Sequence, residues 1–159
     1  MSAAPDQATR TLLLPDAAAT DRLGAALAPR LRPGDTLLLQ GGIGAGKTSL
    51  SRALIRARLG RCEDIPSPSF TLVQVYDDGA AEIWHADLYR LTHPEEGAEL
   101  GLDEAFDRAI CLVEWPDRLG SLRPPAALTL QLDPWDDGRR VTLTGPAAVW
   151  ADRLDGLAA

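Results

Sequence analysis

The sequence contains no asparagine, and its only lysine, Lys47, stands among 16 basic residues of which all the others are arginine. Cysteine occurs twice, as Cys62 and Cys111, which is too few for a disulfide framework or a metal cage. We therefore expect two free thiols in a reducing cytoplasm. No apolar run approaches the roughly 18–20 residues that span a bilayer, and residues 1–10 lack the basic and apolar regions of a secretory signal. These absences predict a cytoplasmic protein that makes no membrane contact.

Aromatic residues are scarce at 5%, whereas apolar residues make up 45% of the chain, a composition typical of a soluble α/β domain. The length of 159 residues predicts one domain, 1–159. The net charge is −7, from 23 acidic and 16 basic side chains. Proteins that hold nucleic acid through phosphate contacts usually carry the opposite sign. We therefore do not expect this chain to bind RNA by itself.

The chain alternates between strand and helix patterns. Continuous apolar runs at 36–39 and 110–113 predict strands buried on both faces of a parallel sheet. An apolar stripe followed by Gly60 indicates a helix at 47–59. The other expected elements are a strand at 11–14, a helix from an Asp16 cap to about 28, hairpins of 70–76 with 82–88 and of 128–132 with 141–143, a helical region at 93–108 interrupted at Gly97 and Gly101, and a terminal helix at 146–154. Together they predict an α/β fold of three layers, with a mostly parallel central sheet and antiparallel hairpin strands.

A glycine-rich loop separates the strand at 36–39 from the helix at 47–59. Residues 41–48, GGIGAGKT, match G-x-x-x-x-G-K-[ST] in the strand–loop–helix context of a phosphate-binding P-loop. Glycines let backbone N–H groups converge on phosphate oxygens, and the helix dipole adds to this anion site. We expect Lys47 to reach the β- and γ-phosphates and the Thr48 hydroxyl to coordinate Mg²⁺. The alternative is a chance lysine in a turn, but a single lysine among arginines favours a role that the wide guanidinium fork does not suit.

Two acidic residues are candidates for metal binding and hydrolysis. Glu114 closes an apolar strand and is the candidate that holds the metal, unless it is simply polar because the strand reaches the surface there. If the segment 84–90 is a strand, alternation places His85, Asp87 and Tyr89 on one face. Asp87 is the candidate that orients the attacking water or a metal-bound water. The alternative is that this face is only solvated.

Two further groups of residues, a pair of hydroxyls and a set of arginines, can each be interpreted in two ways. Ser69 and Thr71 follow a loop stiffened by Pro66 and Pro68, and they either sense the γ-phosphate, as switch loops do, or support the turn. The arginines of the helix at 47–59 and just beyond it form either a solvated face or a docking patch for an acidic partner or RNA: Arg52, Arg56, Arg58 and Arg61. An arginine finger is not evident, although Arg90 could act in cis.

The missing asparagine bears on the choice of base. GTPases of the Ras type read guanine with an Asn-Lys-x-Asp segment, and this chain has no asparagine and commits its one lysine to phosphate. Guanine recognition of that type is therefore excluded, and ATP is the favoured nucleotide.

The ordered motifs GGIGAGKTSL, SPSFTLVQVY, HADLYRL, ELGLDE and ICLVEWPDRL, within residues 35–120, resemble the bacterial TsaE (YjeE) family. This family is the small ATPase of tRNA threonylcarbamoyladenosine biosynthesis. The resemblance implies a P-loop NTPase fold, binding of ATP and Mg²⁺, and weak hydrolysis that depends on TsaB and TsaD. In that complex TsaD transfers threonylcarbamoyl to the adenosine next to the anticodon of tRNAs that read codons beginning with A. Contact with tRNA is therefore expected only through the complex.

The resemblance also assigns roles to residues. It implies that Asp87 is essential to hydrolysis and that Thr48 and Glu114 hold Mg²⁺. Looser matching places Ala17 and Gly138 near the nucleotide. The residues implied to hold the phosphates are Gly44, Ala45, Gly46, Lys47, Thr48 and Ser49.

Two positions depart from the family pattern, and two other functions compete with it. Ser69 stands where the family usually has threonine, and Gly42 where it often has aspartate. A small-molecule kinase of P-loop type would need a basic lid, whereas the region 93–108 is acidic. A module that uses ATP only as a structural clip would need no hydrolytic Asp87.

Overall fold

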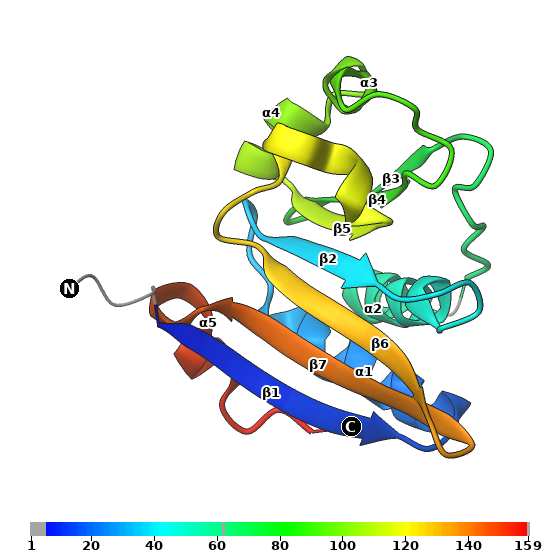
Figure 1. Ribbon diagram of the computed structural model, residues 1–159, viewed down its shortest axis with the longest axis vertical. Helices are drawn as coiled ribbons and strands as arrows, with labels where there is room; N and C mark the ends of the chain where they lie inside the picture. Colours follow the sequence, from blue (N-terminus) through cyan, green and yellow to red (C-terminus); the bar gives the residue numbers. More distant parts are fainter. Residues whose placement is uncertain (1–5, 62, 159) are drawn as a thin grey trace.

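The computed structural model describes residues 6–61 and 63–158. One seven-stranded sheet runs through it in the order β1-β7-β6-β2-β5-β4-β3 (Figure 1). Its strands are β1 (Gln7–Leu14), β2 (Thr36–Gln40), β3 (Val73–Asp77), β4 (Glu82–Asp87), β5 (Ile110–Glu114), β6 (Leu128–Trp135) and β7 (Gly138–Pro146). The middle strands β6, β2, β5 and β4 pair in parallel, whereas β1–β7, β6–β7 and β3–β4 are antiparallel. The expected sheet, parallel in the middle with antiparallel hairpins, is confirmed.

Helices cover both faces of the sheet (Figure 1). They are α1 (Ala17–Leu27), the 3-10 helix η1 (Ala28–Arg30), α2 (Lys47–Leu59), α3 (Glu95–Glu99), α4 (Leu102–Arg108), the 3-10 helix η2 (Pro116–Leu122) and α5 (Ala147–Leu154). Leu37 and Leu39 of β2 pack into a core with α1, α2 and α5, whereas Leu38 points into a second core with α4 and η2. Because side chains alternate along a strand, the three leucines of β2 face both cores, and the three expected layers form.

Several expected boundaries are wrong. The strand expected from 70 begins only at Val73, because a turn closes with the Leu72 amide donating to the Pro68 carbonyl at 2.7 Å. Gly97 does not interrupt a helix but lies inside α3, whereas Gly101 does separate α3 from α4. The first strand is longer than expected, since β1 pairs with β7 along its whole length.

The arginines of α2 hold a neighbouring loop. Arg52 Nε donates to the Ile65 carbonyl at 2.7 Å, and Arg56 Nε donates to the Glu63 carbonyl at 2.9 Å. Arg58 pairs with Asp78 at 2.6 Å, at the turn that follows β3. The interpretation of a solvated face is therefore wrong for these three half-buried side chains. Arg52 and Arg56 attach the segment before β3 to α2, and Arg58 attaches the turn after β3.

The structure describes one of the two cysteines, Cys111. Cys111 is a free, buried thiol in β5, and burial raises its pKa to about 12. A thiol with so high a pKa carries no reactive thiolate at neutral pH. Cys62 lies outside the described residues.

Within the described part of the chain, every helix is too short or too polar to cross a membrane.

Two helices that support the P-loop meet at a glycine. The Asp16 side chain caps α1 by accepting from the Ala19 amide at 2.9 Å, as expected. A Cβ at Gly24 of α1 would lie 2.6 Å from Ala53 Cβ and 2.8 Å from the Leu54 amide nitrogen of α2. Any side chain at position 24 would therefore push the two helices apart.

We expect Gly24→Val to lower the free energy of unfolding by about 1–3 kcal/mol, the usual cost of overpacking a tight contact. Urea denaturation followed by circular dichroism measures this change. The matched control is Ala25→Val, because Ala25 is exposed in the same helix. Equal stabilities for the two variants would contradict the proposed close contact.

Candidate functional site

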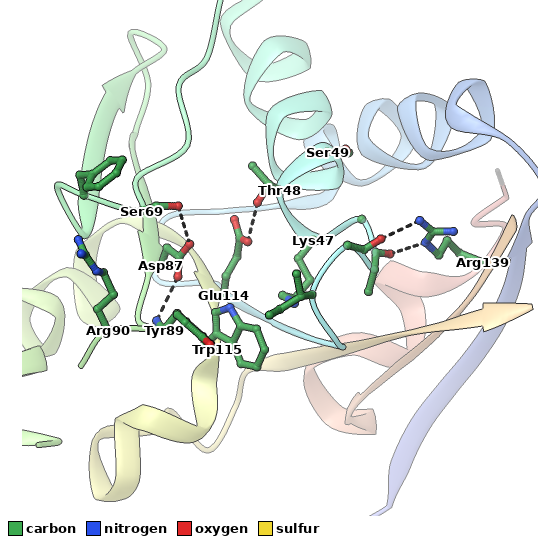
Figure 2. A pocket seen from close by; sticks show the side chains of 15 residues that line it. Lys47, Thr48, Ser49, Ser69, Asp87, Tyr89, Arg90, Glu114, Trp115 and Arg139 are labelled. Carbon is green, nitrogen blue, oxygen red and sulfur yellow. Dashed lines mark hydrogen bonds between the residues drawn. The ribbon is translucent and has the colours of Figure 1, made fainter. Parts of the chain in front are cut away.

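Three neighbouring parallel strands end at one edge of the sheet. β2 leads into the loop 41–46, and the registers pair Leu39 of β2 and Asp87 of β4 with Glu114, the last residue of β5. The carboxyl ends of parallel strands are where α/β sheets bind ligands. A cavity of about 580 Å³ opens there (Figure 2), lined by Ile43, Gly44, Ala45, Gly46, Lys47, Thr48, Ser49, Ser69, Phe70, Asp87, Tyr89, Arg90, Glu114, Trp115 and Arg139.

The loop 41–46 has the backbone shape of an anion site. Gly44 and Gly46 adopt φ values of 79° and 101°, in the left-handed region that residues with a side chain rarely adopt. Helix α2 then begins at Lys47 with no side-chain cap on its first N–H groups. Uncapped N–H donors and the positive end of the helix dipole both favour a bound anion.

Lys47 lies inside this loop. Its Nζ donates to the carbonyls of Gly41 at 2.7 Å and Gly42 at 2.9 Å, and it lies 4.1 Å from the centre of the Trp115 ring. Burial lowers the pKa of Lys47 below its ordinary value, whereas the nearby carboxylates of Glu114 and Asp87 act in the opposite direction. The ammonium is thus placed among acceptors that a phosphate oxygen can replace.

Glu114 is buried, with 2% of its surface exposed. Its Oε1 accepts from Thr48 Oγ1 at 2.8 Å (Figure 2), and its Oε2 lies 2.6 Å from His85 Nε2. The alternative that Glu114 marks a strand reaching the surface is therefore wrong. A hydroxyl and a carboxylate side by side at a phosphate loop fit Mg²⁺, which prefers oxygen ligands and completes its shell with phosphates and waters. Among the described residues, no cluster of three or more His, Cys, Asp or Glu could hold a metal alone.

Asp87 lines the cavity while only 8% of it is exposed. Its Oδ1 accepts from the Tyr89 amide at 3.1 Å and its Oδ2 from Ser69 Oγ at 3.3 Å, as Figure 2 shows. Both Asp87 and His85 are buried, so the alternative of a solvated strand face is wrong for them. Tyr89 lies beyond the end of β4 and is 48% exposed at the cavity.

Ser69 and Thr71 have different surroundings. Ser69 lines the cavity and, besides Asp87, contacts Ser67 Oγ at 2.8 Å. Thr71 is exposed and accepts from Gln74 Nε2 at 3.0 Å, which supports the turn before β3. Ser69 is therefore the one of the pair that borders the site, and its sensing of the γ-phosphate stays a prediction.

Arg139 of β7 is a site residue that sequence reasoning missed. Its Nε donates to the Ala45 carbonyl at 2.9 Å and its Nη2 to the Gly44 carbonyl at 2.7 Å (Figure 2). The only local signal is its place after a turn, because the contact depends on the β6–β7 hairpin lying beside β2. Trp115 is a second such residue: its ring covers Lys47, and it holds a strained backbone at φ 60° and ψ 54°.

Two residues expected near the nucleotide do not line the cavity. Ala17 is exposed at the start of α1, and Gly138 is buried at the start of β7, next to Arg139. Their contact with a nucleotide stays a prediction. Arg90 does line the cavity, and its guanidinium lies 5.2 Å from the centre of the exposed Phe70 ring.

Comparison with known proteins bears on the same segments. The family model described as "Threonylcarbamoyl adenosine biosynthesis protein TsaE" matches residues 14–141. The tRNA threonylcarbamoyladenosine biosynthesis protein TsaE of Rickettsia felis is 38% identical over 130 residues, which are 82% of this chain and 76% of that protein. The protein of the same name from Bacillus subtilis is 36% identical over 137 residues, 85% of this chain and 83% of its own length.

A solved structure is also similar. The crystal structure of Bacillus subtilis YdiB aligns with a TM-score of 0.76 and 29% identity, over 98% of this chain and 97% of that chain. This likeness confirms the expected P-loop NTPase fold. The family model spans both the phosphate loop and the strand ends that carry Asp87 and Glu114. The chain therefore belongs to the TsaE family of tRNA threonylcarbamoyladenosine biosynthesis proteins.

Proposed function

We propose that this protein binds ATP with Mg²⁺ and hydrolyses it weakly alone and faster with its TsaB and TsaD homologues. This hydrolysis supports threonylcarbamoylation of the adenosine next to the anticodon in tRNAs that read codons beginning with A. The transfer itself belongs to TsaD, and tRNA is reached only through the complex, in the cytoplasm. The observation that carries the proposal is that Lys47, Thr48, Glu114 and Asp87 meet in one cavity at the edge of the sheet.

Phosphate binding is assigned to the loop and the start of α2. Residues 44–49 hold the phosphates, and Lys47 Nζ exchanges its carbonyl acceptors for β- and γ-phosphate oxygens. Thr48 Oγ1 and the Glu114 carboxylate, 2.8 Å apart, are the ligands for Mg²⁺. When bound, the ion neutralises charge that develops on the phosphates.

Asp87 is the group that orients water for attack on the γ-phosphate. Two donors fix its carboxylate, one from the backbone at Tyr89 and one from Ser69, so its direction is set before a nucleotide arrives. A carboxylate that lines the cavity and is otherwise buried can accept a proton from an attacking water. Nothing of the region 93–108 lines the cavity, which disfavours the basic lid that a small-molecule kinase would need.

Arg139 sets the shape of the phosphate loop. Its two hydrogen bonds hold the carbonyls of Gly44 and Ala45 outward, toward β7. A peptide N–H points opposite to its carbonyl, so the outward Ala45 carbonyl turns the Gly46 N–H toward the phosphate side, whereas the Ala45 N–H donates to the Gly42 carbonyl at 3.1 Å. Arg139 also adds a positive charge within reach of a polyphosphate.

Partner dependence is tested by measuring ATP hydrolysis with and without the TsaB and TsaD homologues and tRNA. We expect slow turnover alone and a clear increase with both partners, because a partner can supply an arginine to the phosphates in trans. Lys47→Ala is the control and should show no turnover in either condition. Fast hydrolysis that the partners do not change would contradict the proposal.

Asp87→Asn keeps the shape and the Tyr89 contact but removes the proton acceptor. We expect hydrolysis to fall by about 10²–10⁴-fold, the usual contribution of acid–base catalysis, while ATP affinity measured by calorimetry is kept. Loss of ATP binding together with hydrolysis would show that Asp87 holds the nucleotide instead. Full hydrolysis in this variant would remove Asp87 from the reaction.

Arg139→Ala should weaken ATP binding by about tenfold or more, because a hydrogen bond from a charged group contributes about 1.5–3 kcal/mol and about 1.4 kcal/mol is a factor of ten. Calorimetric titration measures this affinity. Arg140→Ala is the matched control, since Arg140 is exposed and its guanidinium lies 3.9 Å from the Asp133 carboxylate, away from the phosphate loop. If both variants bind ATP like the wild type, the loop does not depend on Arg139.

A further inference from the structure

A buried histidine lies behind the carboxylate assigned to the metal. His85 of β4 has no exposed surface, and its Nε2 lies 2.6 Å from Glu114 Oε2. The other carboxylate oxygen, Oε1, accepts from Thr48 Oγ1 at 2.8 Å. His85 itself does not line the cavity. Glu114 is therefore held from both sides, by a hydroxyl that borders the cavity and by an imidazole that does not.

Packing alone does not account for an imidazole at this position. A polar group without exposure costs free energy unless its hydrogen bonds are satisfied. Among the described residues, His85 Nδ1 is buried without a hydrogen-bond partner, so the bond to Glu114 is the one that the ring makes. An apolar residue would suit a buried strand position next to Ile83 and Ala86 better.

The hydrogen-bond pattern also indicates which ring nitrogen donates. A carboxylate that binds a cation is an acceptor, so the Nε2–H of His85 donates to Glu114 Oε2. This bond holds one carboxylate oxygen while the other accepts from Thr48 Oγ1.

We propose that His85 is a positioning residue for the metal site: it fixes Glu114 so that the carboxylate and Thr48 Oγ1 are ready to bind the Mg²⁺ of a nucleotide complex. This assignment rests on the proposed function of the cavity. Hydrogen bonds from behind a ligating carboxylate set its orientation, and their removal typically weakens metal binding by about 10–100-fold. A ring with only a structural role would instead change the stability of the fold.

The test measures metal affinity directly, with Mn²⁺ in place of Mg²⁺ and a non-hydrolysable ATP analogue bound. Free Mn²⁺ is followed by electron paramagnetic resonance for the wild type and for His85→Leu, His85→Gln and His85→Asn. Glutamine places its amide N–H₂ where Nε2 lies, whereas asparagine is too short to reach Glu114. We expect His85→Leu and His85→Asn to weaken Mn²⁺ binding about 10–100-fold, whereas His85→Gln should bind Mn²⁺ nearly as well as the wild type. The affinity of each variant for the ATP analogue, measured in EDTA without metal, should be unchanged.

The outcomes separate this assignment from the function on which it rests. Thermal unfolding shows whether each variant is folded. If His85→Leu does not fold, the comparison of Mn²⁺ affinity between His85→Gln and His85→Asn decides. The assignment is supported if the folded His85→Asn variant binds Mn²⁺ weakly while His85→Gln keeps the Mn²⁺ affinity of the wild type. Equal Mn²⁺ affinity in all folded variants overturns it and leaves the proposed function standing. A wild type that binds the analogue but no Mn²⁺ overturns the metal site itself.

Discussion

The parallel pairing of β5 with β2 on one side and β4 on the other is the constraint on which the site depends. Its registers place Glu114 opposite both Leu39 and Asp87, so the phosphate loop, the metal ligand and the hydrolytic carboxylate end at one level. β5 is buried along its whole length, and a buried strand has a strongly specified register. A slip of one residue would turn Glu114 away from Thr48 and toward the core on the other face.

The same pairing gathers charges that water would otherwise solvate. Lys47, Asp87 and Glu114 expose only 6%, 8% and 2% of their surfaces. A buried charge costs several kcal/mol unless it is paired, and here one ammonium lies among two carboxylates and two loop carbonyls. Burial lowers the pKa of Lys47 while both carboxylates oppose that change. A substitution at any of the three changes the charge balance of this buried set, so we expect it to affect stability as well as chemistry.

Features encoded within short segments could be predicted from the sequence, whereas contacts between distant segments could not. The loop 41–48, the helix that follows it and the ends of β4 and β5 depend on local pattern, and the structure confirms these elements. Arg139 contacts a loop 94 and 95 residues away, which requires knowing that the β6–β7 hairpin lies beside β2. The sequence left the role of Arg52 and Arg56 open because their acceptors are backbone carbonyls, which leave no mark in the sequence. The sequence pattern placed His85 on the same face of the strand as Asp87, but it did not indicate the contact with Glu114 of β5.

Two departures from the family pattern fall where the structure requires little of the side chain. At position 42 the fold uses the backbone carbonyl, which accepts from Lys47 Nζ at 2.9 Å, and a Cβ there would meet nothing within 4 Å. Glycine and aspartate are therefore both compatible with the loop. At position 69 the contact to Asp87 is made by the hydroxyl, which serine and threonine share. Because the segment before β3 is held to α2 by Arg52 and Arg56, the place of that hydroxyl does not depend on a methyl group beside it.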